Sequence, residues 1–228
     1  MFNISELISD LIYTVPAIFI ALSCHEFGHA YAAYKMGDLS QKENGRLTLN
    51  PFRHLDPAGT LCLLLFHVGW GKPVQVDPYF FKDKKQGMIW TAVAGPLVNL
   101  VLGFVFILLD GLLLVLGFHG VIASYLHVLF QTTAVMNIGL GVFNLIPLPP
   151  LDGSKVLMGI LPEETYFKLM QYEMYFSLGL LLLLFTGILD ASLCNFVHFT
   201  RLFKYSRCYF RYFHLRLFGV FFLFNNKD

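Results

Sequence analysis

Three long apolar stretches, separated by polar segments, dominate the chain. They run over residues 11–34, 88–109 and 124–148, and the second contains no charged side chain. A helix needs about 20 predominantly apolar residues to cross the hydrocarbon core of a bilayer. Each stretch meets that length, so the hydrophobic pattern predicts three membrane-spanning helices.

Two shorter apolar segments indicate further contact with the membrane. Residues 174–189 predict a fourth, shorter span, whereas residues 61–68 are too few to cross as a helix and predict a strand or a re-entrant segment. Non-helical backbone is tolerated at membrane depth only where protein or water covers it. We therefore expect an all-α membrane protein, a polytopic helical bundle of about 4–6 transmembrane segments with a small re-entrant or β-like element.

A change in composition divides the chain near residue 190. Residues 1–190 hold the apolar stretches and are expected to form the membrane core, whereas residues 191–228 mix aromatic side chains with basic ones. The basic residues of this tail include Arg201, Lys204, Arg207, Arg211 and Arg216. Its apolar end, residues 217–224, is too short to span, so the tail is either an interfacial amphipathic helix or part of a tilted fifth span.

Composition narrows the class of protein. Hydrophobic residues make up 56% of the chain and charged residues only 14%, against about 25% charged in a typical soluble domain. The net charge of +1 argues against a nucleic-acid partner, and the expected surroundings are the lipid bilayer. The four cysteines lack CxxC spacing, so no disulfide framework or cysteine zinc site is expected. The N-terminal segment lacks the basic residues of a cleavable signal peptide, so the first span is expected to remain in the mature protein.

The distribution of basic residues predicts how the chain crosses the membrane. Lys and Arg concentrate in residues 35–87 and recur in the connector 154–171, whereas the N-terminus and the turn at 117–120 have none. Loops rich in Lys and Arg stay on the cytoplasmic side. We therefore expect an integral multi-pass protein of the cell membrane with both basic segments in the cytoplasm. The basic tail departs from this topology if residues 174–189 cross the membrane.

An HExxH motif lies inside the first apolar stretch. Besides tyrosines and Cys24, the ionisable side chains between residues 11 and 34 are His25, Glu26 and His29. Ionisable groups inside a membrane span are energetically costly and usually functional. Two histidines four residues apart lie on one face of a helix, which suits one zinc ion, with the glutamate as general base. The motif alone also fits a histidine pair that is satisfied by hydrogen bonds between helices, as in a transporter pore.

Asp152 is the best candidate for a third metal ligand. Catalytic zinc sites use three protein ligands and leave one position open. Asp152 follows the prolines that end the third apolar stretch, and an odd number of crossings brings it to the same side of the membrane as His25 and His29. Taken alone, an aspartate before Gly153 is more typical of a turn than of a metal ligand, and the HExxH motif elsewhere in the chain is what favours the ligand.

Five ordered motifs resemble a known family. HEFGH at 25–29 and NLIPLPPLDG at 144–153 are similar to the HExxH and NxxPxPxLDG motifs of the site-2 proteases, which are intramembrane zinc metalloproteases. Three further segments resemble the same family: NPFRHLDPAGT at 50–60, GWGKPV at 69–74 and AGPLVN at 94–99. The resemblance covers residues 15–160 and is closest to the short form of the family, which lacks a PDZ domain.

The resemblance implies a function and a set of site residues. The implied activity is that of a zinc metalloendopeptidase that cleaves membrane-anchored substrates within or near transmembrane helices, in regulated intramembrane proteolysis. The implied site residues are His25, His29 and Asp152 as ligands of one Zn²⁺ per chain, with Glu26 and Asn144 as catalytic residues. Glu26 would be the general base, and Asn144 would hold substrate or the oxyanion. Residues 1–190 would form the intramembrane metalloprotease core, with its active site toward the cytoplasmic side.

The resemblance gives less specific roles to other residues. Asn99 follows a family pattern, and residues 69–76 resemble a re-entrant loop or hairpin near the substrate. His54 and Asp56 are expected to stabilise a turn. The histidines without a motif context are expected to be structural: His67, His119, His127, His198 and His214.

Two other functions fit parts of the sequence. A non-proteolytic membrane protein that binds or transports divalent metal would use the histidines, but transport needs no general base such as Glu26. A soluble zincin-type protease would use the same motif, but the uncharged residues 88–109 argue against a soluble chain.

Overall fold

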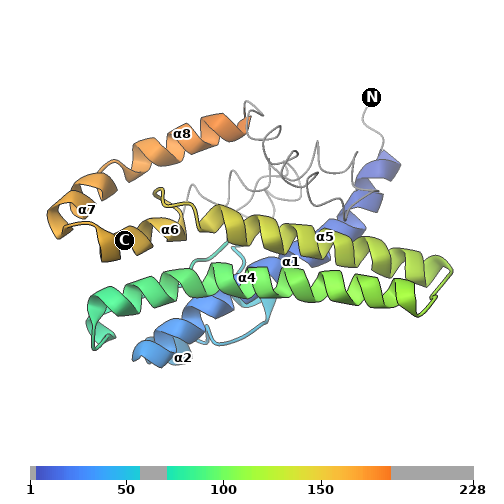
Figure 1. Ribbon diagram of the computed structural model, residues 1–228, viewed down its shortest axis with the longest axis horizontal. Coiled ribbons are helices and arrows are strands. Elements are labelled where there is room, and N and C mark those ends of the chain that lie inside the picture. The colour runs from blue at the N-terminus through green and yellow to red at the C-terminus, as the bar shows by residue number, and fades with distance from the viewer. Residues whose placement is uncertain (1–3, 57–70, 186–228) are drawn as a thin grey trace.

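The computed structural model describes residues 4–56 and 71–185 (Figure 1). Three long helices form its body: α1 (Ile4–Met36), α4 (Lys84–Val115) and α5 (Val121–Asn144). Each of them contains a segment that is long and apolar enough to cross a membrane. The prediction of an all-α membrane protein is therefore confirmed, and all three predicted long spans are helices.

Shorter elements connect and follow the long helices. They are α2 (Ser40–Glu43), the 3₁₀ helices η1 (Pro51–Arg53) and η2 (Pro78–Phe80), α6 (Asp152–Ile160), α7 (Glu163–Met170) and α8 (Glu173–Phe185). In Figure 1, α6 and α7 lie beyond the C-terminal end of α5, and α8 turns back above it in this view. Within the described residues, the only β-type pairing is an isolated antiparallel bridge between Leu55 and Gly71.

α4 extends beyond the apolar stretch that predicted it. It begins after Asp83, whose side chain accepts a hydrogen bond from the Gln86 N–H and caps the first turn. It continues past Asp110, which therefore lies inside the helix. The buried Asp110 carboxylate pairs with His127 of α5 and accepts a hydrogen bond from Gln131. An acidic residue is tolerated there because α5 supplies its polar partners.

The three long helices approach one another closely because small residues lie at their contacts. α4 and α5 form an antiparallel hairpin, and α1 crosses it (Figure 1). A Cβ atom on Gly28 of α1 would lie 2.9 Å from the Ala94 carbonyl oxygen of α4. One on Gly141 of α5 would lie 2.9 Å from the Pro96 carbonyl oxygen. Small residues at such crossings are typical of helix packing in membranes.

Side-chain contacts set the direction of α1 against the hairpin. Ala17 and Ala21 of α1 pack against Met136 and Leu140 of α5. The buried Asn99 of α4 donates a hydrogen bond from Nδ2 to the Ala21 carbonyl, at 3.3 Å. As a result, the C-terminal half of α1 lies against the N-terminal half of α4 and near the C-terminal end of α5.

Some predictions concern segments outside the described residues. Residues 61–68, the predicted strand or re-entrant segment, belong to these, as do the boundary at residue 190 and the tail 191–228. The fourth predicted span, residues 174–189, is described only as far as Phe185, as helix α8. The number of spans beyond the three long helices therefore stays a prediction.

Candidate metal centre

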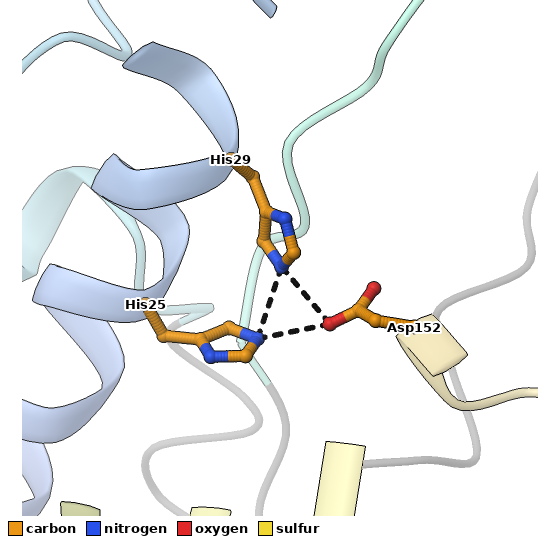
Figure 2. A group of neighbouring side chains, drawn as sticks. All are labelled: His25, His29 and Asp152. Carbon is orange, nitrogen blue, oxygen red and sulfur yellow. Dashed lines mark hydrogen bonds and ion pairs between the residues drawn. The ribbon is translucent and has the colours of Figure 1, made fainter. Parts of the chain in front are cut away.

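His25, His29 and Asp152 bring one potential ligand atom each to a common point (Figure 2). The two histidines lie one turn apart on α1, and Asp152 is the first residue of α6. The distance between the two Nε2 atoms is 3.0 Å, and Asp152 Oδ2 lies 3.1 Å from His25 Nε2 and 3.0 Å from His29 Nε2. All three side chains are buried, so three polar groups converge in the interior of a membrane protein.

The backbone of α4 orients the His29 ring. His29 Nδ1 donates a hydrogen bond to the Thr91 carbonyl oxygen at 2.7 Å, which places the ring proton on Nδ1 and leaves the Nε2 lone pair directed at the common point. The ring also lies directly over Gly95, where a Cβ atom would be 2.4 Å from Nε2. Glycine at position 95 is therefore a steric requirement for this position of the imidazole.

A tight turn after α5 places Asp152. α5 ends at Asn144, and the chain folds back so closely that a Cβ on Gly153 would lie 2.5 Å from the carbonyl oxygens of Leu145 and Ile146. Ser154 Oγ donates to the Leu151 carbonyl at 2.7 Å and closes the start of α6. The glycine after Asp152 thus allows the turn that directs this carboxylate at α1.

The Asp152 carboxyl is ionised at neutral pH. Burial desolvates it and by itself would raise its pKa, but the neighbouring His29 imidazole and Lys155 ammonium hold the pKa well below its usual value. A depressed pKa means that the carboxyl keeps its negative charge as the pH falls, until the pH drops below the usual range for aspartate. The group is therefore in the state that ligates a metal.

The donor set fits a tetrahedral zinc ion. Zinc bonds to histidine nitrogen and carboxylate oxygen are about 2.0 Å long, so two ligand atoms of one tetrahedral ion are about 3.3 Å apart. The three observed separations, 3.0–3.1 Å, are close to that value. Two histidines and one carboxylate also match the ligand set of known catalytic zinc sites, which keep a fourth position open.

Glu26 and Asn144 line the same cavity as the three candidate ligands. The cavity has a volume of about 220 Å³. Glu26 Oε2 accepts a hydrogen bond from the Val74 N–H at 3.1 Å, and Asn144 Nδ2 donates to the Leu140 carbonyl at 3.0 Å. Both side chains are buried, with exposed fractions of 6% and 5%. The structure thus places all five residues of the predicted site around one space.

Two further predicted residues lie elsewhere. Asn99 is held against α1 by its hydrogen bond to the Ala21 carbonyl, and it does not line the cavity. His54 is fully buried and donates from Nε2 to the Thr48 carbonyl at 2.7 Å, a contact that stabilises the turn around Pro51. This contact agrees with the turn-stabilising role expected of His54.

Sequence reasoning missed the residues that orient the site. Thr91 and Val74 act through backbone groups, which leave no side-chain signature. Gly95, which contacts His29 closely, lies in the AGPLVN segment. That motif was the one feature of the sequence that could have pointed to this glycine. Lys155 is one of the basic residues of the connector 154–171, which indicated only topology, although its Nζ lies 3.2 Å from Asp152 Oδ1.

Comparisons with known proteins identify a peptidase family and several relatives named as zinc metalloproteases. The family model described as "Peptidase family M50" matches residues 109–186. The "Putative zinc metalloprotease YwhC" of Bacillus subtilis is 38% identical over 77% of this chain and 81% of its own length. The "Putative zinc metalloprotease Rip2" of Mycobacterium tuberculosis is 34% identical over 73% of this chain and 63% of its own length. The "Zinc metalloprotease MJ0392" of Methanocaldococcus jannaschii is 30% identical over 77% of this chain and 43% of its own length. No solved structure matches the chain.

Proposed function

Since this chain belongs to peptidase family M50, the site-2 proteases, and is a membrane zinc metalloprotease, we propose that it cleaves membrane-anchored proteins within or near their transmembrane helices. The proposal includes one zinc ion per chain, with His25, His29 and Asp152 as its ligands. The observation that carries it is the convergence of these three ligand atoms beside Glu26 in one cavity.

Glu26 is the proposed general base. Zinc at such a site supplies Lewis acidity, which polarises a carbonyl and lowers the pKa of a water to about 7. Glu26 takes a proton from the attacking water and later gives it to the leaving amide nitrogen, as a general base that becomes a general acid. The Val74 N–H holds Oε2 of the carboxylate, which fixes the direction in which Oε1 points.

Asn144 is the proposed partner of the substrate carbonyl. Its side chain lines the cavity beside Asp152, and one hydrogen of its Nδ2 is engaged by the Leu140 carbonyl. An amide nitrogen carries two hydrogens, so the second is a suitable donor to a developing oxyanion or to a substrate carbonyl. This contact would orient the scissile bond toward the metal and Glu26.

The cavity is proposed to open toward the cytoplasm of the cell. Thr91 lies near the start of α4, just after the basic segment 35–87, and Asp152 lies just before the basic connector 154–171. Basic segments favour the cytoplasmic side, so water would reach the site from there. The outward-facing apolar side chains of α4, such as Leu97, Val101 and Phe104, would contact lipid.

The substrate must lose helical structure before cleavage. In an intact helix the peptide groups are hydrogen-bonded to one another and shielded from attack. Residues with low helix propensity near the cleavage site are therefore expected to favour hydrolysis. Residues 72–76 of the enzyme belong to no helix, and Val74 and Val76 line the cavity, which leaves this segment available to pair with an unwound substrate segment. Replacing the glycines of a single-span test substrate by leucine should make it resistant. Unchanged cleavage would contradict the unwinding requirement.

The central experiment measures zinc content and hydrolysis together in the detergent-purified protein. Wild type should hold about one zinc per chain and cleave a single-span test substrate. Asp152→Ala should lose the zinc. Glu26→Gln, which preserves shape, should keep the zinc and lose activity by about 10²–10⁴-fold.

Two outcomes would contradict the proposal. Zinc retained unchanged in Asp152→Ala would mean that Asp152 is not a ligand, and full activity in Glu26→Gln would mean that Glu26 is not the base. The alternative of metal transport predicts zinc uptake into proteoliposomes that survives Glu26→Gln. Cleavage without any uptake would exclude transport.

A further inference from the structure

Lys155 lies beside the candidate metal centre and has no role in the scheme described above. It follows Asp152 by three residues on α6, so both side chains lie on one face of that helix. Lys155 Nζ lies 3.2 Å from Asp152 Oδ1, and Lys155 lines the same cavity as the candidate ligands. The lysine side chain is 34% exposed, whereas that of Asp152 is only 7% exposed.

The two oxygens of Asp152 face different partners. Oδ2 lies 3.1 Å from His25 Nε2 and 3.0 Å from His29 Nε2, on the side of the proposed metal. Oδ1 faces the Lys155 ammonium group. A carboxylate can bind a metal through one oxygen or through both, and rotation of the group changes one mode into the other. A cation fixed on Oδ1 opposes that rotation.

We infer that Lys155 is a positioning residue that holds Asp152 in one-oxygen ligation through Oδ2. This inference rests on the proposed metal site. With zinc bound, Asp152 would then supply one ligand atom, as each histidine would, and the site would keep an open position. Residues that hydrogen-bond to a metal-ligating carboxylate commonly govern metal affinity in this way.

The burial of the carboxylate makes this contact important. Without Lys155, Oδ1 of the buried Asp152 would lose a charged partner, and a buried charge without a partner is strongly unfavourable. The carboxylate would then turn away from the geometry in which Oδ2 meets the two histidines. The opposite expectation is that the lysine repels a nearby metal cation, in which case its removal would tighten binding. The two accounts predict changes of opposite sign.

The test compares metal binding by the full-length, detergent-purified protein and its variants. Each protein is stripped of metal with a chelator, and its zinc affinity is then measured by competition with a chelator of known affinity. Lys155→Met should weaken zinc binding by about 10–100-fold, the usual effect of losing such a partner. Lys155→Arg keeps a cationic donor and should restore most of the affinity.

A matched control comes from the next helix. Lys168 of α7 pairs with Glu164 at 2.8 Å, but their side chains are 68% and 82% exposed. Lys168→Met removes the same charge and side chain at a surface site, and it should leave zinc affinity unchanged. Absorption spectra of the Co²⁺-substituted proteins give a second readout. The spectrum should change in Lys155→Met and not in Lys168→Met, because only the former alters how Asp152 ligates the metal.

The outcomes separate this inference from the proposed function. The role of Lys155 would be overturned if Lys155→Met bound zinc with wild-type affinity and kept the Co²⁺ spectrum unchanged. Tighter zinc binding by this variant would overturn it as well. Either result would leave the metal site intact. Absence of zinc binding in wild type, or equal binding in Asp152→Ala, would overturn the metal site itself and the inference with it. If Lys155→Met does not fold, Lys155→Gln takes its place. It keeps a donor without the charge and should weaken binding measurably, so unchanged affinity there would overturn the inference.

Discussion

The Val74 main-chain N–H donates a hydrogen bond to Glu26 Oε2 at 3.1 Å, which joins the non-helical segment after Gly71 to the helix that carries both histidines. The same segment is fixed from its other side, because Gln41 Nε2 donates to the Gln75 carbonyl at 2.7 Å. The proposed general base is therefore oriented by the part of the chain that we propose to meet the substrate.

Removing the Val74 N–H should impair catalysis without affecting the metal. Val74→Pro deletes the donor, so Glu26 loses its fixed orientation, and misplacement of a catalytic group by about 1 Å can cost about 10²-fold in rate. Hydrolysis of a single-span substrate should fall by about this factor, with zinc content unchanged. Val74→Ala keeps the N–H and serves as the control. Equal losses in both variants would show that the side chain, not the hydrogen bond, is responsible.

A methyl group at position 95 should displace a proposed zinc ligand. The Cβ of Gly95→Ala would lie 2.4 Å from His29 Nε2 and 2.6 Å from Cε1, closer than atoms can approach, so the imidazole has to move. We expect zinc affinity to fall by at least about 10-fold, as for other changes that disturb ligand orientation. Competition with a chelator measures the effect.

Gly111 provides the matched control for Gly95. It lies on the same helix, and a Cβ there would meet no atom within 4 Å. Gly111→Ala should therefore leave zinc affinity unchanged. If both variants lose zinc equally, the effect arises from α4 as a whole and not from the contact with His29.

The Asp110–His127 pair should stabilise the hairpin of α4 and α5 without contributing to the metal centre. Asp110 follows Thr91 by 19 residues on α4, which corresponds to about 28 Å along the helix, so the pair is remote from the site. Interhelical polar contacts in membranes contribute about 0.6 kcal/mol on average and up to about 1.7 kcal/mol.

A double-mutant cycle tests this prediction. Asp110→Ala, His127→Ala and the double variant should give a coupling free energy of unfolding within that range, and all three should bind zinc like wild type. His119→Ala, at an exposed position beside the Gly120 turn, should have no effect. Loss of zinc from Asp110→Ala would contradict a purely structural role.

Removal of the metal should lower thermal stability only when the three ligands are intact. A ligand that binds the folded state at 100 times its Kd stabilises it by about 2.7 kcal/mol. Adding a chelator should therefore lower the Tm of wild type. It should leave the Tm of Asp152→Ala unchanged, because that variant has no zinc to lose. A Tm shift of equal size in both proteins would place the stabilising metal at another site.

The sequence by itself determined the features that depend on local spacing. A stretch of about 20 predominantly apolar residues has few alternatives to a membrane-spanning helix, so α1, α4 and α5 were predictable. A spacing of four residues from His25 to His29 places both rings on one helical face wherever that helix lies. Motifs also predicted a zinc site and named Asp152 as a candidate ligand. The Asp152-Gly153 pair is visible in the sequence because the turn that carries Asp152 leaves no room for a side chain at position 153.

Only the tertiary structure decided how these side chains are held. The Thr91 carbonyl contacts His29 across 62 residues of sequence, and the Val74 N–H contacts Glu26 across 48. Every residue type offers a backbone carbonyl and every type but proline an N–H, so neither contact leaves a sign in the sequence. Asp110 and His127 have no common motif, and their pairing depends on the register of two antiparallel helices. A sequence pattern specifies which side chains are present on a helix face, whereas the packing of the helices specifies which of them meet.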